Sequence, residues 1–227
     1  MGTTKIKAIE LVFDWNLWPR HSVNGLDATN VARMREALRS GFTLPPVIAN
    51  KADYRIIDGF HRTQSNLDVF GDDVEMDVEL REYESEAAMF LEAGILNANQ
   101  GMPMGPKDRA HFILKCRKYK YPWPAIAKAL SMDEKRLRAF VEKRSAKTTS
   151  GETIPLPGGA INLGGGKVLT EVQEHYARHT GGVVPEMYVS MLINALKSDT
   201  LMLDEKGIRR LRELNELIEQ ILDGCLV

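Results

Sequence analysis

The sequence has few cysteines and no long apolar run, and each shortage argues against a class of protein. Among its 227 residues are two cysteines, Cys116 and Cys225, which lie far apart without a second cysteine or a histidine at ligand spacing. Structural zinc and a disulfide framework are therefore disfavoured. No apolar run approaches the roughly 20 residues that cross a bilayer, and residues 1–14 lack the apolar core of a signal peptide. We therefore expect a cytoplasmic protein without membrane contact.

The net charge is also small, at −1, but the charges are distributed unevenly along the chain. Residues 107–144 contain 12 lysines and arginines against 4 acidic residues, whereas the rest of the chain carries 18 basic and 27 acidic residues. A basic segment within an acidic protein is typical of a local nucleic-acid contact. Two solvated faces that neutralise each other explain the same charges equally well, so the distribution alone leaves both interpretations open.

The overall composition is that of an ordinary globular protein, with 44% hydrophobic and 27% charged residues. This balance argues against wholesale disorder. The length suits one large domain or two small ones, since domains usually span about 100–150 residues.

The first hundred residues alternate between strand-like and helix-like segments. Strands are expected at 6–13, 45–49, 54–58 and 74–83, and helices at 27–39, 61–69 and 85–93. Met34 and Leu38 illustrate the helical spacing, and Asp27 or Thr29 is a candidate cap. Residues 1–100 are therefore predicted to form an α/β domain.

A second, entirely helical unit is predicted over residues 101–146. Its expected helices are 107–119, 123–130 and 133–143, with a short turn at Ser131-Met132 between the last two. Two short helices joined by a tight turn, the second beginning with charged residues, fit a helix-turn-helix. Short helical pairs are also common in enzymes that never touch DNA, so the fit leaves an alternative.

The remainder of the chain is predicted to be a linker followed by helices. Residues 147–167 are rich in Ser, Thr, Gly and Pro, which is typical of a linker. Residues 168–227 are expected to form a helical self-association region, with helices at 168–179, 185–197 and 204–222. Four apolar residues of the last helix have the spacing of a short coiled-coil seam: Leu211, Leu214, Ile218 and Ile221. A helix packed on its own domain is the alternative.

The segment 54–62 carries the most chemical information. A buried strand runs into Gly59 and the next turn opens a helix, so backbone N–H groups point outward at a helix N-terminus and form an anion site. His61 and Arg62 add donors, and Arg62 is able to grip a phosphate with two parallel hydrogen bonds. The alternative is that Arg62 pairs with Asp58 or with the acidic stretch that follows.

Three motifs, taken in order, resemble the N-terminal domain of the ParB/sulfiredoxin superfamily. They are Trp18-Pro19-Arg20, then Gly41-Phe42-x-Leu44-Pro45-Pro46-Val47-Ile48, then Tyr54-Arg55-Ile56-Ile57-Asp58-Gly59-Phe60-His61-Arg62. In ParB-type chromosome-partition proteins the matching elements are a Pro-Arg box, a Gly-x-x-x-Pro-hydrophobic strand and a Gly-Glu-Arg-Arg box, with a helix-turn-helix after them. The resemblance covers residues 6–144 and implies an α+β fold class. The expected architecture is a ParB/sulfiredoxin-like N-terminal α/β domain, an all-α helix-turn-helix middle domain and a helical C-terminal tail.

The resemblance also implies a site for CTP or another nucleoside triphosphate with Mg²⁺, because the Gly-Glu-Arg-Arg box of the family holds the triphosphate. A Glu-Asn pair ahead of the family's helix-turn-helix contributes to the same site, and it aligns with Ala98-Asn99. Asn99 is thereby implied as a magnesium ligand. The residues assigned to the nucleotide are Arg20, Gly59, Phe60, His61, Arg62, Thr63 and Asn99.

The sequence departs from the family at positions that bear on turnover. Phe60 and His61 replace Glu and Arg of the box, and Gln64 stands where a further Arg is usual. Ala98 replaces the Glu linked to hydrolysis, so nucleotide binding is expected to outlast turnover, with at most slow hydrolysis. The Gly-x-His-Arg spelling is nearer to sulfiredoxins and to ParB-like kinases of free serine, but Phe60 occupies the position of the reactive cysteine of sulfiredoxin.

The predicted function is that of a homodimeric ParB-like DNA-binding protein with a nucleotide switch, in plasmid or chromosome partition or in transcriptional regulation. Basic residues in and around the helix-turn-helix are expected to contact duplex DNA, mainly at phosphates: Lys118, Lys120, Lys135, Arg136, Arg138 and Lys143. The alternative is an enzyme of the same fold, either a small-molecule kinase, an NTPase or a nuclease. For such an enzyme Asp58 is the nearest candidate general base, and the sequence identifies no catalytic residue.

Overall fold

The computed structural model describes most of the chain. The described ranges are 2–20, 25–99, 104–179, 185–198 and 205–225. The contacts within the chain divide it into two compact units, Met1–Gly182 and Val183–Val227. Among the helices in these ranges, none is long and apolar enough to cross a membrane.

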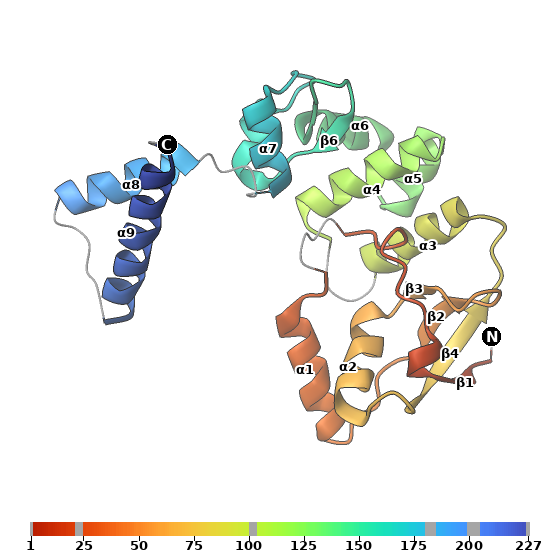
Figure 1. The fold of residues 1–227 in the computed structure, drawn as a ribbon. Helices are drawn as coiled ribbons and strands as arrows, with labels where there is room; N and C mark the ends of the chain where they lie inside the picture. Colours follow the sequence, from red (N-terminus) through yellow and green to blue (C-terminus); the bar gives the residue numbers. More distant parts are fainter. Residues whose placement is uncertain (1, 21–24, 100–103, 180–184, 199–204, 226–227) are drawn as a thin grey trace. The chain divides into compact units, whose positions relative to one another are not determined.

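The first unit begins with a mixed sheet (Figure 1). Its strands within the described residues are β1 (Thr4–Lys7), β2 (Val47–Asn50), β3 (Ile56–Asp58) and β4 (Glu75–Arg81), in the order β1-β4-β2-β3. The β4 strand is antiparallel to β1 and parallel to β2, and β2 is antiparallel to β3. The α/β character predicted for this part of the chain is confirmed.

Burial follows the sequence pattern in the two central strands. All four residues of β2 are buried, whereas β4 buries Met76 and Val78 and exposes Glu75 and Asp77. The first strand, predicted at 6–13, is shorter in the structure, where β1 ends at Lys7. After β1 the chain turns through a short 3-10 helix and crosses to the other edge of the sheet, where Val12 bridges to Arg55 of the β3 hairpin.

Helices cover this sheet and lead toward the second half of the unit. The two helices α1 (Ala28–Arg39) and α2 (Phe60–Phe70) pack side by side (Figure 1). The α1 helix begins as predicted, because the Asp27 carboxylate accepts a hydrogen bond from the Asn30 N–H at 2.8 Å. The α3 helix (Glu86–Asn99) packs against β3 and is longer than the expected 85–93, because its apolar face continues into the next core.

Three helices follow at the positions that the periodicity predicts: α4 (Pro106–Lys118), α5 (Trp123–Ala129) and α6 (Glu134–Lys143). Their core continues that of the sheet domain rather than standing apart from it. Phe90 of α3 stacks on Phe112 of α4 at 5.4 Å, and both lie in one buried cluster with Ile57 of β3. The domain boundary predicted between residues 100 and 101 therefore does not interrupt the hydrophobic core.

The expected linker at 147–167 is wrong, because this segment is folded. It begins at the last residue of β5 (Ser145–Lys147) and contains β6 (Thr153–Pro155) and a 3-10 helix (Gly158–Leu163), and α7 (Glu171–His179) follows. These elements share a small buried cluster: Ala146, Ile154, Leu156, Ala160, Leu169 and Ala177. The glycines that resembled a linker occupy turns instead, as Gly151 does at a φ of 86°.

This folded segment also caps α6. The Leu156 N–H donates to the Arg144 carbonyl at 2.7 Å, and the Gly165 N–H donates to the Glu142 carbonyl at 2.9 Å. The last carbonyls of a helix have no partner within the helix. Segment 145–169 therefore stabilises the end of α6, where a flexible linker would leave these carbonyls to water.

The second unit contains the helices expected near the end of the chain, α8 (Pro185–Lys197) and α9 (Glu205–Cys225). On α9, Leu214 and Ile218 of the predicted seam are 38% and 43% exposed, and the Ile221 side chain lies outside the described residues. Exposed apolar side chains at this spacing leave self-association a prediction that the single chain does not test.

Candidate functional site

A pocket of about 280 Å³ lies where α2 begins. Five of the residues predicted for the nucleotide line it: Arg20, Gly59, Phe60, His61 and Arg62. Trp18, Asp58 and Asn97 line it as well, from the segment before α1, the end of β3 and the end of α3. Segments that are distant in the sequence thus converge on the N-terminus of one helix.

Glycine is required at position 59 by both backbone conformation and space. Its φ is 122°, and a Cβ there would lie 2.8 Å from a methyl group of Val47. Gly59 is the N-cap of α2 and makes no side-chain cap, so the first N–H groups of the helix are left for another acceptor. This arrangement agrees with the anion site that the sequence predicts.

The Phe60 side chain belongs to the core rather than to the pocket surface. It is 1% exposed, and its ring lies 4.8 Å from that of Trp18 and 5.6 Å from that of Phe13. The Phe60 ring packs the start of α2 into the hydrophobic core, so Phe60 has its backbone N–H rather than its side chain to offer a ligand.

Thr63 does not reach the pocket. Its side chain is fully buried, and the hydroxyl donates to the Gly59 carbonyl at 3.2 Å. Thr63 is thus absent from the lining of this pocket, and its predicted contact with a nucleotide stays a prediction. Its hydroxyl instead closes the first turn of the helix.

The sequence predicts that His61 donates a hydrogen bond, whereas its Nε2 accepts one in the structure. The Asp27 N–H donates to His61 Nε2 at 3.0 Å, so that nitrogen carries no proton. Burial lowers the pKa of His61, and the nearby Arg20 guanidinium lowers it further, although Asp27 and Asp58 oppose the shift. The neutral ring therefore ties α2 to the start of α1 and gives no positive charge to the pocket.

Arg62 has partners within the protein. Its guanidinium forms an ion pair with Asp58 at 2.5 Å and donates to the carbonyls of Pro45 and Pro46 at 3.1 and 2.6 Å. The Arg62 side chain is 13% exposed. The pairing with Asp58 that the sequence left as an alternative is therefore what the structure contains, and contact with a phosphate stays a prediction.

Arg20 and Trp18 are buried donors at the same pocket. Arg20 is 9% exposed and donates to Asn97 Oδ1 at 3.3 Å, and burial lowers its pKa while Asp108, Asp58 and Asp27 oppose the shift. Trp18 is 6% exposed, and among the described residues its indole Nε1 has no hydrogen-bond acceptor. A buried N–H without an acceptor is costly, so it favours a ligand that brings one.

Trp18 was missing from the predicted site. Its position directly before Pro19-Arg20 was the available signal, since a tryptophan next to a pocket residue offers a ring for packing and one N–H donor.

The magnesium ligand predicted at Asn99 cannot be placed, because that side chain lies outside the described residues. Asn97, two positions earlier on α3, lines the pocket and donates from Nδ2 to the Ala93 carbonyl at 2.8 Å. Within the described ranges no cluster of three or more His, Cys, Asp or Glu side chains is arranged to hold a metal ion.

A basic surface is formed by α6 and the end of α4. All six residues predicted to contact DNA are exposed, on α6 or near the end of α4: Lys118, Lys120, Lys135, Arg136, Arg138 and Lys143. The turn between α5 and α6 is tight, with Ser131 at a φ of 50°. The Asp133 carboxylate caps α6 by accepting from the Arg136 N–H at 3.0 Å, so this acid stabilises the helix that carries the basic residues.

A tryptophan holds two of the arginines on this surface. The guanidinium groups of Arg117 and Arg138 lie 4.9 and 4.5 Å from the ring centre of Trp123. Arg138 also donates twice to Glu134, at 2.9 and 2.7 Å. The geometry adds Arg117 to the predicted set and links α4, α5 and α6 at one surface.

No family model matches the sequence, and no curated protein matches it. The fold is similar to that of solved ParB structures. One is a Pnob8-like ParB-N domain, with 16% identity over 67% of this chain and 57% of that one, and a TM-score of 0.40. The present chain thus spans a little over half the length of that protein.

Two further similar structures are of the C-terminally truncated chromosome-partitioning protein ParB from Caulobacter crescentus. The one complexed to the centromeric parS site has 12% identity over 84% of this chain and 90% of that one, with a TM-score of 0.48. The one complexed with CTP-gamma-S has 15% identity over 85% and 99%, with a TM-score of 0.37. The function proposed below rests on the residues of this chain.

Proposed function

We propose that this chain is a ParB-like DNA-binding protein with a nucleotide switch, acting in the cytoplasm in DNA partition or transcriptional regulation. The observation that carries the proposal is the convergence of donors at the start of α2. The first N–H groups of α2 and the side chains of Arg20 and Trp18 belong to residues that line one pocket. Helix N–H groups and a guanidinium favour an oxyanion such as a phosphate as the ligand of this pocket.

The size of the pocket limits what it holds. Small-molecule sites usually measure about 300–1,000 Å³, and 280 Å³ accommodates the phosphates rather than a whole nucleoside triphosphate. Arg62 then acts indirectly, because its ion pair neutralises the Asp58 carboxylate that would otherwise repel a phosphate. The base of the nucleotide lies outside the described pocket in this proposal.

Magnesium fits this site only as a companion of the nucleotide. Mg²⁺ is usually held by one or two carboxylates together with substrate phosphates and water. Asp58 is the one carboxylate among the described pocket residues, and it is bound to Arg62. The protein therefore offers no all-protein magnesium cage in its described part, and a bound triphosphate would supply most of the ligands.

The DNA-binding half of the proposal rests on the basic surface of α6. Lys135, Arg136 and Lys143 are exposed there, while Trp123 and Glu134 hold Arg138 in place. Lysine and arginine contacts to phosphates account for most of the affinity of proteins for duplex DNA. The exposed Leu214 and Ile218 of α9 support a homodimer in the same proposal.

The competing function is an enzyme of the same fold. Asp58 lines the pocket and is the candidate general base, but it would first have to leave Arg62. Ala98 supplies no catalytic carboxylate where the resembling family has one. Both observations favour binding over turnover.

A nucleotide-binding screen with and without duplex DNA, followed by a turnover assay, tests the proposal. We expect one nucleoside triphosphate to bind, DNA to alter its affinity, and hydrolysis to be slow. Absence of binding for every nucleotide would contradict the proposal. Fast transfer of a phosphate from ATP to a small hydroxyl compound would establish the kinase alternative instead.

A further inference from the structure

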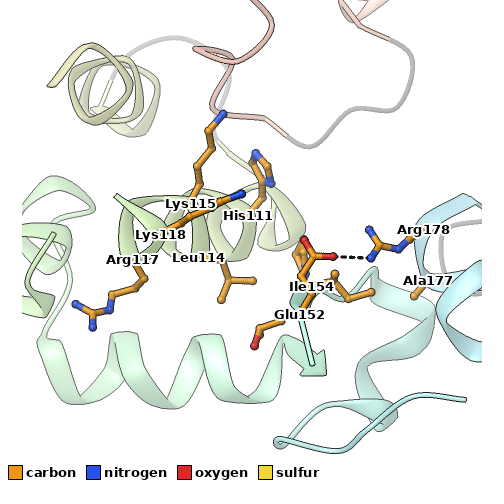
Figure 2. Close-up of a pocket in the computed structure, with 11 residues that line it drawn as sticks. His111, Leu114, Lys115, Arg117, Lys118, Glu152, Ile154, Ala177 and Arg178 are labelled. Atoms are coloured by element: carbon orange, nitrogen blue, oxygen red, sulfur yellow. Dashed lines mark hydrogen bonds and ion pairs between the residues drawn. The ribbon is translucent and has the colours of Figure 1, made fainter. Parts of the chain in front are cut away.

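A second, larger cavity borders α4. It is a groove of about 670 Å³ between α4, β6 and α7, all within the first unit (Figure 2). The α4 side of the groove carries a stripe of side chains that includes His111, Leu114 and Lys118, and Ile154 and Ala177 line the side formed by β6 and α7. This volume falls within the usual range for small-molecule sites, roughly 300–1,000 Å³.

The floor of the groove is apolar because two hydrophobic clusters meet there. Leu114 packs against the core of α3 to α6, whereas Ile154 and Ala177 belong to the cluster of segment 145–169 and α7. Figure 2 shows Leu114 on α4 facing the space that Ile154 and Ala177 border from the other side. A ligand with an apolar body would be sheltered from water on this floor.

The charges on the rim differ in how far the protein already neutralises them. Arg178 binds Glu152 at 2.8 Å (Figure 2) and Glu174 at 3.0 Å, so two carboxylates already occupy its one positive charge. The Lys115 ammonium is turned away from the groove, since it donates to the Asn16 carbonyl and lies 4.6 Å from the ring centre of Phe90.

Lys118 is the remaining cationic side chain to consider among the described residues that line the groove. No ion pair among the described residues joins it to a carboxylate, and its side chain lines the groove beside His111 (Figure 2). Arg117, one position earlier, is stacked on Trp123 and donates to the Tyr121 carbonyl at 2.6 Å. An anionic group that enters the groove would therefore find its partner at Lys118.

We propose that this groove binds a small amphipathic anion, with an aromatic or aliphatic body on the apolar floor and a carboxylate, sulfonate or phosphate at Lys118. A duplex phosphate would use the charge but not the floor formed by Leu114, Ile154 and Ala177. The site is independent of the proposed nucleotide pocket, because the two share no lining residue.

The test is an NMR titration of the full-length chain with 4-phenylbutyrate, using 4-phenyl-1-butanol as the neutral probe of similar shape. We expect amide shifts confined to His111–Lys118, Glu152–Pro155 and the end of α7, with the acid bound at least about fivefold more tightly than the alcohol. Lys118→Gln should remove that preference, whereas Lys128→Gln, at an exposed position on α5 that does not line the groove, should keep it. Leu114→Ala should weaken both probes equally.

Three outcomes would overturn the proposal. The first is a set of shifts elsewhere on the protein, and the second is equal affinity of wild type and Lys118→Gln for the acid. The third is displacement of the acid by duplex DNA in the wild type, which would make Lys118 part of the DNA surface instead. Because these readouts involve no nucleotide, the groove and the proposed function fail or succeed separately.

Discussion

Arg62 and Asp58 form an ion pair of 2.5 Å across the first turn of α2, and the same guanidinium donates to the carbonyls of Pro45 and Pro46. One side chain therefore joins the end of β3, the start of α2 and the approach to β2. In this chain, Arg62 of the motif that resembles a phosphate-binding box holds the wall of the pocket together.

Replacing Arg62 should consequently destabilise the fold. We expect Arg62→Gln to lower the free energy of unfolding by about 1–3 kcal/mol, because it leaves a partly buried carboxylate and two carbonyls without their donor. Urea denaturation is the measurement, and Arg33→Gln, at an exposed position on α1, is the control. Unchanged stability in Arg62→Gln would mean that the arginine is free to serve a ligand.

The stability of the protein should also depend on the protonation of His61. Its pKa is lowered in the folded state, so between that value and the ordinary value of about 6.5 the unfolded chain binds a proton that the native ring does not. Stability should therefore fall as the pH drops below about 6.5, because protonation removes the acceptor for the Asp27 N–H.

Comparison of the wild type with His61→Gln isolates this contribution from the other four histidines. The difference in unfolding free energy between the two proteins should be constant above pH 7 and should shrink toward lower pH. A difference that is the same at every pH would show that His61 does not titrate between the two states.

Gly164 should be needed for the junction between segment 145–169 and α6. A Cβ at this position would collide with the Lys143 carbonyl oxygen, whereas a Cβ at Gly158 meets nothing within 4 Å. We expect Gly164→Ala to destabilise the protein by about 1–3 kcal/mol, as overpacked sites do, and Gly158→Ala to be nearly neutral. Equal melting temperatures of the two variants would argue that this segment does not support α6.

The elements that the sequence predicts well are those with a strong period of their own. Helices α4, α5 and α6 lie within one or two residues of their expected positions, because each buries one apolar stripe. Segment 147–167 was predicted to be a linker because its buried residues, such as Ile154 and Leu156, stand singly among turn-forming residues. Only their tertiary contacts show that they form a core.

The candidate site was predictable in its location but not in its chemistry. Gly59 before a helix predicts an anion site, and a pocket lies at that position, but the binding of an anion there stays a prediction. The partner of His61 lies 34 residues away and those of Arg62 include carbonyls 16 and 17 residues away, so neither is visible in a local motif. The orphan indole of Trp18 likewise depends on the packing around it.

The basic surface of α6 should contact DNA mainly through phosphates. Replacing Lys135, Arg136 and Arg138 together by Gln should weaken binding to duplex DNA and reduce the slope of log K against log salt by up to about 3, roughly one for each phosphate that the protein no longer neutralises. A charge-matched control replaces Lys5, Lys7 and Lys51, which lie on the sheet domain. If both triple variants keep the wild-type slope, the DNA surface lies elsewhere.

Isothermal titration of nucleoside triphosphates, CTP first, into the wild type, Trp18→Phe and Arg20→Gln tests the central claim most directly. Trp18→Phe keeps an aromatic ring and removes a buried donor that has no acceptor in the described structure, so it should weaken binding several-fold without destabilising the free protein. Arg20→Gln removes a charged donor, and a hydrogen bond to a charged group is worth about 1.5–3 kcal/mol, so affinity should fall by about tenfold to a hundredfold. Equal affinities in all three proteins, or no binding to the wild type, would contradict the account.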